Sequence, residues 1–369
     1  MIPVNTPLLS GNEKKYLLEC IETGWISSEG PYVTRFENEF SAYIGRKSGV
    51  AVANGSAALD IAIQALNISK GDEVIMPDFT ILSPAASIVR QGATPVLVDS
   101  NPDTWNMNIS QVEKKITSKT KAIVVVHIYG LPVEMGPLLE LAKTYRLKIV
   151  EDAAEMHGQT YCGKKCGSFG DISIFSFYPN KHITTGEGGM LLTDDASLAE
   201  RCRSLRNLCF LPEKRFVHEE IGWNYRMTNL QAALGVAQLE QIEKTVARKR
   251  EIGKMYTELL NDISSFQLPL EKTEYAENIY WVYGIMLNEK STVNAAEAMK
   301  KLAERKIGTR PFFYPMHLQP VFKKMGLFQK EHYPVSENMA ERGFYIPSGT
   351  GLTNKEIRSV AEVLHQIFC

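Results

Sequence analysis

Short apolar runs alternate with stretches of helical spacing along the first half of the chain. Strand-like runs lie at 50–53, 73–76, 95–98, 122–127 and 148–150, and helical spacing occurs at 57–66, 81–90 and 136–145. The run 122–127 is almost continuously apolar, which is typical of a parallel strand covered on both faces. This alternation predicts an α/β fold with a mostly parallel sheet between helices, and ligand sites beyond the carboxyl ends of the strands.

The pattern changes after a long helix that we predict from Asn229 to about Leu260. A strand at 280–286, a helix at 293–305, an aromatic loop at 308–317 and a closing helix at 355–368 follow it. The chain of 369 residues exceeds the usual size of one core. We therefore expect a large domain over 1–250, including an N-terminal arm, and a smaller α+β domain over 251–369.

The stretch 171–193 is predicted to form two buried strands joined by a loop that holds Lys181. Pro179, Asn180 and the glycines at 186, 188 and 189 constrain the backbone of this loop. A lysine becomes a nucleophile when burial or a nearby positive group lowers its pKa, and it then commonly forms a Schiff base with a carbonyl, such as that of pyridoxal phosphate (PLP). Most loop lysines are simply solvated, so the loop alone leaves both interpretations open.

Four further candidate residues lie at the ends of three predicted strands. Gly55 and Ser56 join a strand to a helix, and this arrangement binds phosphate through free N–H groups and the helix dipole, although Ser is also a good N-cap. Asp152 either caps the next turn or pairs with a protonated pyridine nitrogen. Ser176 either binds a phosphate or only ends its strand. Trp25, in an early loop, either lines a site or fixes the arm to the core.

Composition and charge narrow the class of partner. Lys and Arg number 41 against 42 Asp and Glu, without a basic block, which argues against nucleic acid and membrane as partners and favours a small substrate. Six cysteines form no CxxC pair, so we expect free thiols in a reducing compartment and no metal site. The N-terminus has no leader-like pattern, and no run of eighteen apolar residues occurs. We expect a cytoplasmic protein.

Four motifs occur together in a fixed order: 54–56 (NGS), 151–155 (EDAAE), 176–189 (SFYPNKHITTGEGG) and 222–228 (GWNYRMT). With them the chain resembles, over nearly its whole length, the DegT/DnrJ/EryC1/StrS family. The resemblance implies a PLP-dependent nucleotide-sugar aminotransferase with the aspartate aminotransferase fold (fold type I). It also implies a homodimer with shared active sites.

The resemblance assigns roles to residues of this sequence. Lys181 would hold the cofactor covalently and move protons at the substrate carbon, and Asp152 would pair with the pyridine nitrogen. At the cofactor phosphate the resemblance implies Gly55, Ser56 and Ser176, together with Asn224 from the second subunit. At the pyridine ring it implies Glu155 and Ile81. The substrate contacts that it implies are Trp25, Ser27, His218, Arg226, Tyr314 and His317.

The implied reaction is ping-pong. L-Glutamate would give up its amino group, and the C4 ketone of a nucleotide-linked 4-keto-6-deoxyhexose would receive it, as in the making of sugars for surface polysaccharides. GDP is the preferred nucleotide. For the substrate, the alternatives are a C3 ketone and a dTDP- or UDP-linked sugar. For the protein, the alternatives are an amino-acid transaminase, in which Arg310 would bind the substrate carboxylate, and a non-catalytic sugar-nucleotide sensor.

Two positions depart from or qualify the family pattern. Ile81 stands where the family usually has an aromatic residue stacked on the pyridine ring, so either flat apolar packing replaces stacking or Phe79 moves in. Some relatives are keto-sugar dehydratases with His in place of the reactive lysine. Here the lysine is present and His182 follows it, which favours transamination.

Overall fold

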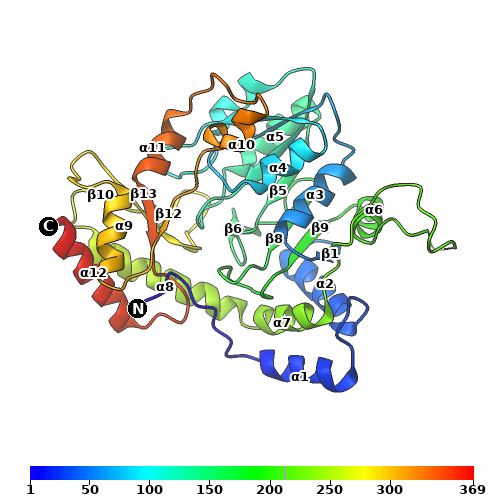
Figure 1. Cartoon of the computed structure of the whole chain (residues 1–369), viewed down its shortest axis with the longest axis horizontal. Coiled ribbons are helices and arrows are strands. Elements are labelled where there is room, and N and C mark those ends of the chain that lie inside the picture. Colours follow the sequence, from blue (N-terminus) through cyan, green and yellow to red (C-terminus); the bar gives the residue numbers. More distant parts are fainter. Residues whose placement is uncertain (212) are drawn as a thin grey trace.

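The computed structural model describes residues 1–211 and 213–369, and its elements form two larger sheets and one two-stranded sheet, β6-β7, with helices around them (Figure 1). The helices are α1 Glu13–Thr23, α2 Pro31–Ile44, α3 Gly55–Ala65, α4 Ser83–Arg90, α5 Met135–Tyr145, α6 Ala196–Arg206, α7 Asn229–Leu239, α8 Ile242–Leu260, α9 Ala295–Glu304, α10 Pro320–Lys324, α11 Pro334–Arg342 and α12 Asn354–Phe368. The strands are β1 Ser48–Val52, β2 Glu73–Pro77, β3 Thr94–Val98, β4 Thr120–Val126, β5 Lys148–Asp152, β6 Thr160–Tyr161, β7 Lys164–Lys165, β8 Ile172–Ser176, β9 Gly189–Thr193, β10 Phe266–Gln267, β11 Tyr283–Leu287, β12 Arg310–Pro311 and β13 Gly343–Ile346.

The larger sheet has seven strands in the order β1-β9-β8-β5-β4-β2-β3. β9 pairs antiparallel with both β1 and β8, and the other pairs are parallel. All strands except β9 therefore run in one direction, and their carboxyl ends meet at one edge. The predicted mostly parallel α/β sheet is confirmed.

Both faces of this sheet are buried because successive strand residues point to opposite sides. Val50, Val52 and Ile174 belong to a core shared with α3 and α4. Ala51 and Phe175, which alternate with them, belong to a second core with α2 and α7, and α5 covers the remaining part of that face. The near-continuous apolar run 122–127 is explained by this two-sided burial.

The smaller sheet is antiparallel, in the order β10-β11-β13-β12, and shares a core with α8, α9 and α12. It supplies the predicted α+β part of the chain. The predicted division at residue 250 falls inside α8, and it remains a prediction.

The single helix predicted over 229–260 is wrong, because α7 ends at Leu239 and α8 begins at Ile242. The two helices have different partners: α7 packs on α1 and α2, whereas α8 packs on α12. Glu240 at the break accepts hydrogen bonds from Asn12 and Tyr16 of the first helical region. No Gly or Pro marks the break, so the local sequence did not signal it.

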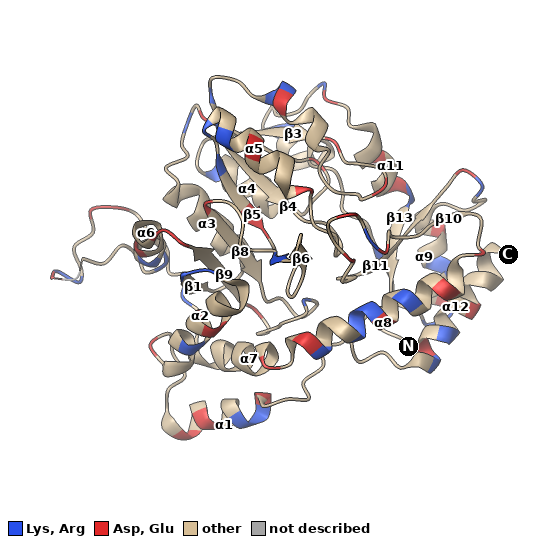
Figure 2. Ribbon diagram, turned by 180° about the vertical axis from the view of Figure 1, so that it is seen from behind, with Lys and Arg blue, Asp and Glu red and all other residues tan. Residues whose placement is uncertain are grey.

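Acidic and basic residues are mixed along the exposed helices, as Figure 2 shows for α8 and α12. This agrees with the balanced charge of the sequence and with the absence of a basic block. The six cysteines are all free thiols. Within residues 1–211 and 213–369, no helix is both long and apolar enough to cross a bilayer.

Candidate active site

A cavity of about 480 Å³ lies beyond the carboxyl ends of β1, β5 and β8. The segments that follow these strands line it with Gly55 and Ser56, with Asp152 and Glu155, and with Ser176 and Lys181. These six predicted cofactor residues are far apart in the sequence, and the parallel strands bring them to one edge. A volume of this size suits a small-molecule cofactor together with part of a substrate.

The Lys181 side chain lies in this cavity and is only 10% exposed, so it is not a solvated loop residue. Its loop is held by hydrogen bonds from its own N–H to the carbonyl of Tyr178 at 2.9 Å and from Thr184 Oγ1 to the carbonyl of Phe177 at 3.0 Å. Gly186 lies in the same loop with φ of 79°, a conformation that favours glycine. Lys181 Nζ lies 3.8 Å from Glu155 Oε1 and 3.7 Å from the centre of the Trp281 ring.

Burial shifts the three ionisable groups of the site toward their neutral forms. It lowers the pKa of Lys181, although Glu155 and Asp152 oppose the shift. Burial raises the pKa of Glu155 to about 8 and that of Asp152 to about 6, although the Lys181 charge opposes both shifts. Because burial lowers the pKa of the Lys181 amine and raises that of the Glu155 carboxyl, the two values move toward each other, which favours proton exchange in general acid–base chemistry.

The N-terminus of α3 forms an anion cradle at one end of the cavity. The first N–H groups of a helix have no partner inside the helix and point outward with the positive end of its dipole. Asn54 caps the helix by accepting from the N–H of Ala57 at 2.8 Å. A Cβ at Gly55 would lie 2.8 Å from Ser176 Cβ, so only glycine lets the helix start this close to the end of β8.

These groups fit PLP. The buried Asp152 carboxylate has one N–H donor, that of Ala154 at 3.1 Å, and a protonated pyridine nitrogen would supply the cation that a buried carboxylate needs. The cradle at Gly55, Ser56 and Ser176 would take a phosphate. Lys181 supplies an amine whose pKa is lowered by burial. The protonated ring nitrogen, the phosphate and the carbonyl of PLP would therefore each have a chemically matching group in the cavity: Asp152, the cradle and Lys181.

Ile81 lines the cavity with Thr80, whereas Phe79 is fully buried and does not reach it. Phe79 packs edge-on against Tyr129, Phe312 and Phe313. Of the two possibilities for the missing stacked ring, the structure favours apolar packing by Ile81, because moving Phe79 would open this aromatic cluster.

The prediction missed four aromatic lining residues, Tyr178, Trp281, Phe313 and Tyr345. Tyr178 lies in the lysine loop, and the other three come from the part of the chain that carries the smaller sheet. Trp281 Nε1 donates to the carbonyl of Asn180 at 2.9 Å, so its ring is fixed beneath the Lys181 amine. Tyr178 and Phe313 lie in stretches that the sequence had marked, but no local pattern marked Trp281 or Tyr345, because only the packing of the two sheets brings them to the cavity.

Five predicted residues do not line the cavity of the single chain. Asn224 is exposed, in a bridge with Asn207, and Arg226 Nη1 donates to Asn207 Oδ1 at 2.5 Å. His218 is exposed on the segment after α6, with its Nδ1 2.7 Å from the carbonyl of Leu208. The other two are Trp25 and Ser27, exposed beside α1. Their roles remain predictions.

Tyr314 and His317 also lie outside the cavity. Tyr314 is exposed, and His317 is fully buried with its Nδ1 2.8 Å from Asp78 Oδ2 and its Nε2 2.9 Å from Glu337 Oε1. His317 therefore joins the end of β2 to α11. The structure does not bring its ring to the site where a sugar would lie, so the predicted sugar contact rests on the resemblance alone.

We predict that His317→Leu lowers the free energy of unfolding by about 2 to 4 kcal/mol, because Asp78 would keep a buried carboxylate without its partner. Burial alone would lower the pKa of His317, but hydrogen bonds to Asp78 and Glu337 outweigh it and raise the pKa. A raised folded-state pKa adds stability below about pH 6.5, and this stability is lost as the pH rises through the folded-state value.

Urea unfolding at about pH 6 and about pH 8.5 measures this effect. The wild type should lose stability over that range, and His317→Leu should lose less of it. His365→Leu, at a half-buried histidine of α12, serves as the control and should change stability little. Equal stability of His317→Leu and wild type at the lower pH would contradict the prediction.

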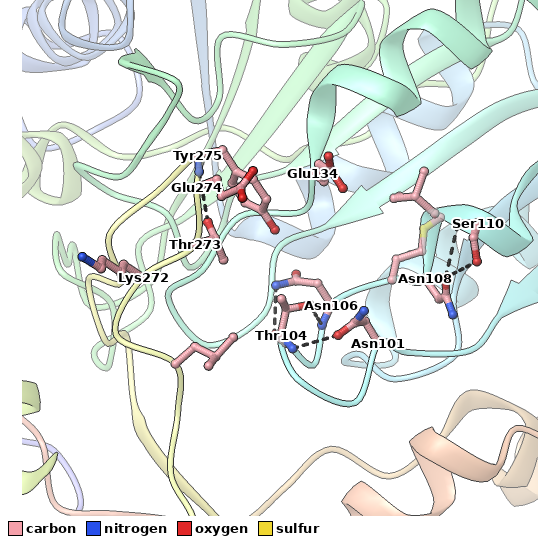
Figure 3. A pocket seen from close by; sticks show the side chains of 13 residues that line it. Asn101, Thr104, Asn106, Asn108, Ser110, Glu134, Lys272, Thr273, Glu274 and Tyr275 are labelled. Atoms are coloured by element: carbon pink, nitrogen blue, oxygen red, sulfur yellow. Dashed lines mark hydrogen bonds between the residues drawn. The ribbon is translucent and has the colours of Figure 1, made fainter.

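A second cavity, of about 670 Å³, is lined by the loop after β3 and the segment 270–275 (Figure 3). Its amide side chains are already used inside the loop: Asn101 Oδ1 accepts from the N–H of Thr104 at 3.0 Å, and Asn108 Oδ1 accepts from Ser110 Oγ at 2.7 Å. These residues shape turns, and we assign no chemistry to this cavity.

His127, Glu151 and Cys166 form a buried group of ligand-type side chains behind the sheet. Glu151 accepts hydrogen bonds from His127 at 3.0 Å and from the N–H groups of Gly167 and Phe169 at 2.6 and 2.8 Å. His127 Nδ1 accepts from the N–H of Val133 at 3.0 Å. The carboxylate and both ring nitrogens are thus satisfied within the protein, so the group is structural.

Comparison with known proteins agrees with this site. The model of the DegT/DnrJ/EryC1/StrS aminotransferase family matches residues 7–365. The chain is 41% identical over 367 residues to a GDP-perosamine synthase of Escherichia coli O157:H7, covering 100% of this chain and 98% of the relative. It is 40% identical over 366 residues to a GDP-perosamine synthase of Caulobacter vibrioides, covering 99% and 98%.

A solved structure extends the similarity to the fold. The DesV protein of S. venezuelae, in complex with a ketimine intermediate, superposes with a TM-score of 0.89 at 31% identity, covering 96% of this chain and 94% of that one. The aspartate aminotransferase-like fold and the dependence on PLP, both expected from the sequence, are confirmed. The chain belongs to the DegT/DnrJ/EryC1/StrS aminotransferase family.

Proposed function

We propose that the protein transfers the amino group of L-glutamate to the C4 ketone of a GDP-linked 4-keto-6-deoxyhexose. The observation that carries the proposal is the buried group of Lys181, Glu155 and Asp152 beside the N-terminus of α3. Relatives that are about 40% identical over their whole length and are named GDP-perosamine synthase support the choice of nucleotide and sugar.

Each residue of the site has a task in such a reaction. When bound, PLP serves as an electron sink for the substrate carbon that loses or gains a proton. Lys181 is the base and acid at that carbon, and its lowered pKa lets it act in both senses. Asp152 would hold the proton on the pyridine nitrogen. The α3 N-terminus and Ser176 would anchor the phosphate, while Trp281 and Ile81 add apolar surface to the cavity wall.

A panel assay tests the proposal. The purified protein is incubated with L-glutamate and, in separate reactions, GDP-, dTDP- and UDP-linked 4-keto- and 3-keto-6-deoxyhexoses, and the products are identified by mass spectrometry. We expect 2-oxoglutarate and a GDP-linked 4-amino sugar. Amination of only a free sugar or of simple keto acids would overturn the proposal. Arg310, the residue expected to bind the carboxylate of an amino-acid transaminase substrate, is exposed and lies outside the cavity.

We also propose that the protein is a homodimer in which each active site uses residues of both chains. Figure 1 shows the segment between α6 and α7 extending away from the body of the chain. This segment and the region around α1 expose large apolar side chains, which is typical of a surface that another protein covers. The exposed residues are Leu8, Leu9, Leu18, Ile21, Trp25, Ile26, Phe216, Val217 and Ile221.

A mixed dimer tests the shared site. Lys181→Ala removes the reactive amine, and Asn224→Asp places a negative charge where the resemblance puts the partner's phosphate. If the two residues serve opposite sites, a mixed dimer has one site with both defects and one site with neither. We therefore expect mixing under exchange conditions to restore up to about half of the wild-type activity per mixed dimer.

Subunit exchange is verified by native mass spectrometry, and each variant mixed with itself is the control. If exchange occurs and no activity returns, both residues serve the same site, and the shared arrangement is rejected. Asn224 would then be a turn residue only.

A further inference from the structure

A small cavity of about 20 Å³ lies on the other side of the lysine loop from the active-site cavity. Asn180 and Lys181 line both cavities, so the loop forms the wall between them. The N-terminal arm closes the small cavity with residues 5–8. Asn5 Nδ2 donates to the carbonyl of Pro179 at 3.1 Å and ties the arm to this loop.

His182 presents an unused acceptor in this region. Its Nδ1 lies 3.2 Å from the carbonyl oxygen of His157, and because a carbonyl only accepts, Nδ1 must carry the hydrogen. Burial, with a contribution from the nearby Lys249 ammonium, lowers the pKa of His182 to about 3. The ring is therefore neutral, its Nε2 is an acceptor, and this buried atom has no hydrogen-bond partner among the described residues.

Two further groups on the same cavity are incompletely bonded. Asn180 Oδ1, also buried, has no partner within the described part of the chain. Burial lowers the pKa of the Lys249 amine to about 7, so below that pH it is an ammonium with three hydrogens. It donates to the carbonyls of Trp281, at 3.0 Å, and Ser348. Among the described residues, the one further acceptor within reach of its third hydrogen is Ser348 Oγ, at 3.5 Å. Residues that line this cavity thus carry two acceptor atoms without a partner and one underused donor.

These groups select one class of ligand. An anion would face two acceptor atoms, and a cation would face the Lys249 ammonium. A neutral molecule with two donor hydrogens and one accepting lone pair satisfies all three groups, and the volume admits a single water, which needs at least about 10 to 15 Å³. Buried waters typically make about three hydrogen bonds, the number available here.

We propose that this cavity holds one permanently bound water molecule that donates to His182 Nε2 and Asn180 Oδ1 and accepts from Lys249 Nζ. The water joins the lysine loop to α8. Lys249 also holds the carbonyl of Trp281, whose ring lies under the Lys181 amine. His182 is therefore a positioning residue that acts through the water to keep Lys181 in place, and this part of the inference rests on the proposed function.

The first test observes the resting protein, so it does not depend on the identity of the substrate. A high-resolution crystal structure of the full chain should show one density peak within hydrogen-bond distance of the three named atoms. Nitrogen-15 NMR should find His182 as the neutral Nδ1–H tautomer from about pH 6 to about pH 9. An empty cavity, a peak with the strength of an ion, or the Nε2–H tautomer would each overturn the water site.

The second test addresses the positioning role. In His182→Leu, which removes the acceptor, we expect kcat to fall about 10-fold with KM changed by less than about 2-fold, and crystals should show Lys181 Nζ displaced from Glu155. His182→Gln keeps an acceptor and should recover most of the rate. His365→Leu is the matched control and should behave as wild type.

If Lys181 stays in place in His182→Leu and kcat is unchanged, the positioning role is rejected. If the panel assay fails but the water peak, the tautomer and the displacement of Lys181 are all observed, only the proposed substrate is wrong. The two failures are therefore distinguishable.

Discussion

Replacing Lys181 with alanine is expected to lower the transamination rate by about 10⁴-fold while the protein stays folded, because the reaction loses its proton-transfer base. The side chain is 10% exposed and lies between Glu155 and the Trp281 ring, and no other lysine lines the described active-site cavity. The variant should also lose the absorbance of covalently held cofactor. Single-turnover measurements with L-glutamate and absorbance spectra check both effects.

Lys148→Ala is the matched control, since Lys148 begins β5 and pairs on the surface with Asp171 at 2.7 Å. This control should keep the wild-type rate and spectrum. Circular dichroism and unfolding curves establish that both variants are folded. A Lys181→Ala protein with near-normal turnover would reject the assignment of the site and, with it, the proposed reaction.

Asp152→Asn is expected to have the second largest effect, a loss of about 100-fold or more in both half-reactions, with a small change in stability. In the structure, burial raises the pKa of Asp152 to about 6. A protonated ring nitrogen would lower this pKa again, because an opposite charge favours the carboxylate. Asparagine keeps the size of the side chain and its acceptor for the Ala154 N–H, and it removes only the charge that keeps the ring nitrogen protonated.

Separate rates for the glutamate half-reaction and the keto-sugar half-reaction measure this effect. Asp171→Asn is the control, because Asp171 is a carboxylate at the opposite end of the strands and accepts from the N–H of Ile149 at 2.9 Å. An unchanged glutamate rate in Asp152→Asn would leave this carboxylate as a cap for the N–H of Ala154 and nothing more.

The sequence by itself determined the strands and helices of the larger sheet and the residues at their ends. Periodicity is a local property: a buried parallel strand needs a continuous apolar run, and the run 122–127 meets that need without reference to the rest of the chain. Motif order then led to Lys181, Asp152 and the Gly55 cradle. Parallel strands necessarily bring their carboxyl ends to one edge of the sheet, so the predicted residues lie together in the structure.

Only the tertiary structure decided which other side chains meet Lys181. Trp281 and Tyr345 reach the cavity because the two sheets pack together, and a contact across 100 residues or more leaves no local pattern. Contacts between distant parts of the chain also explain the break between α7 and α8, because these two helices pack against different helices. They likewise explain the burial of His317 between Asp78 and Glu337. The buried acceptor of His182 can likewise be recognised only in the folded loop, because whether an atom has a hydrogen-bond partner depends on the distances to every neighbour.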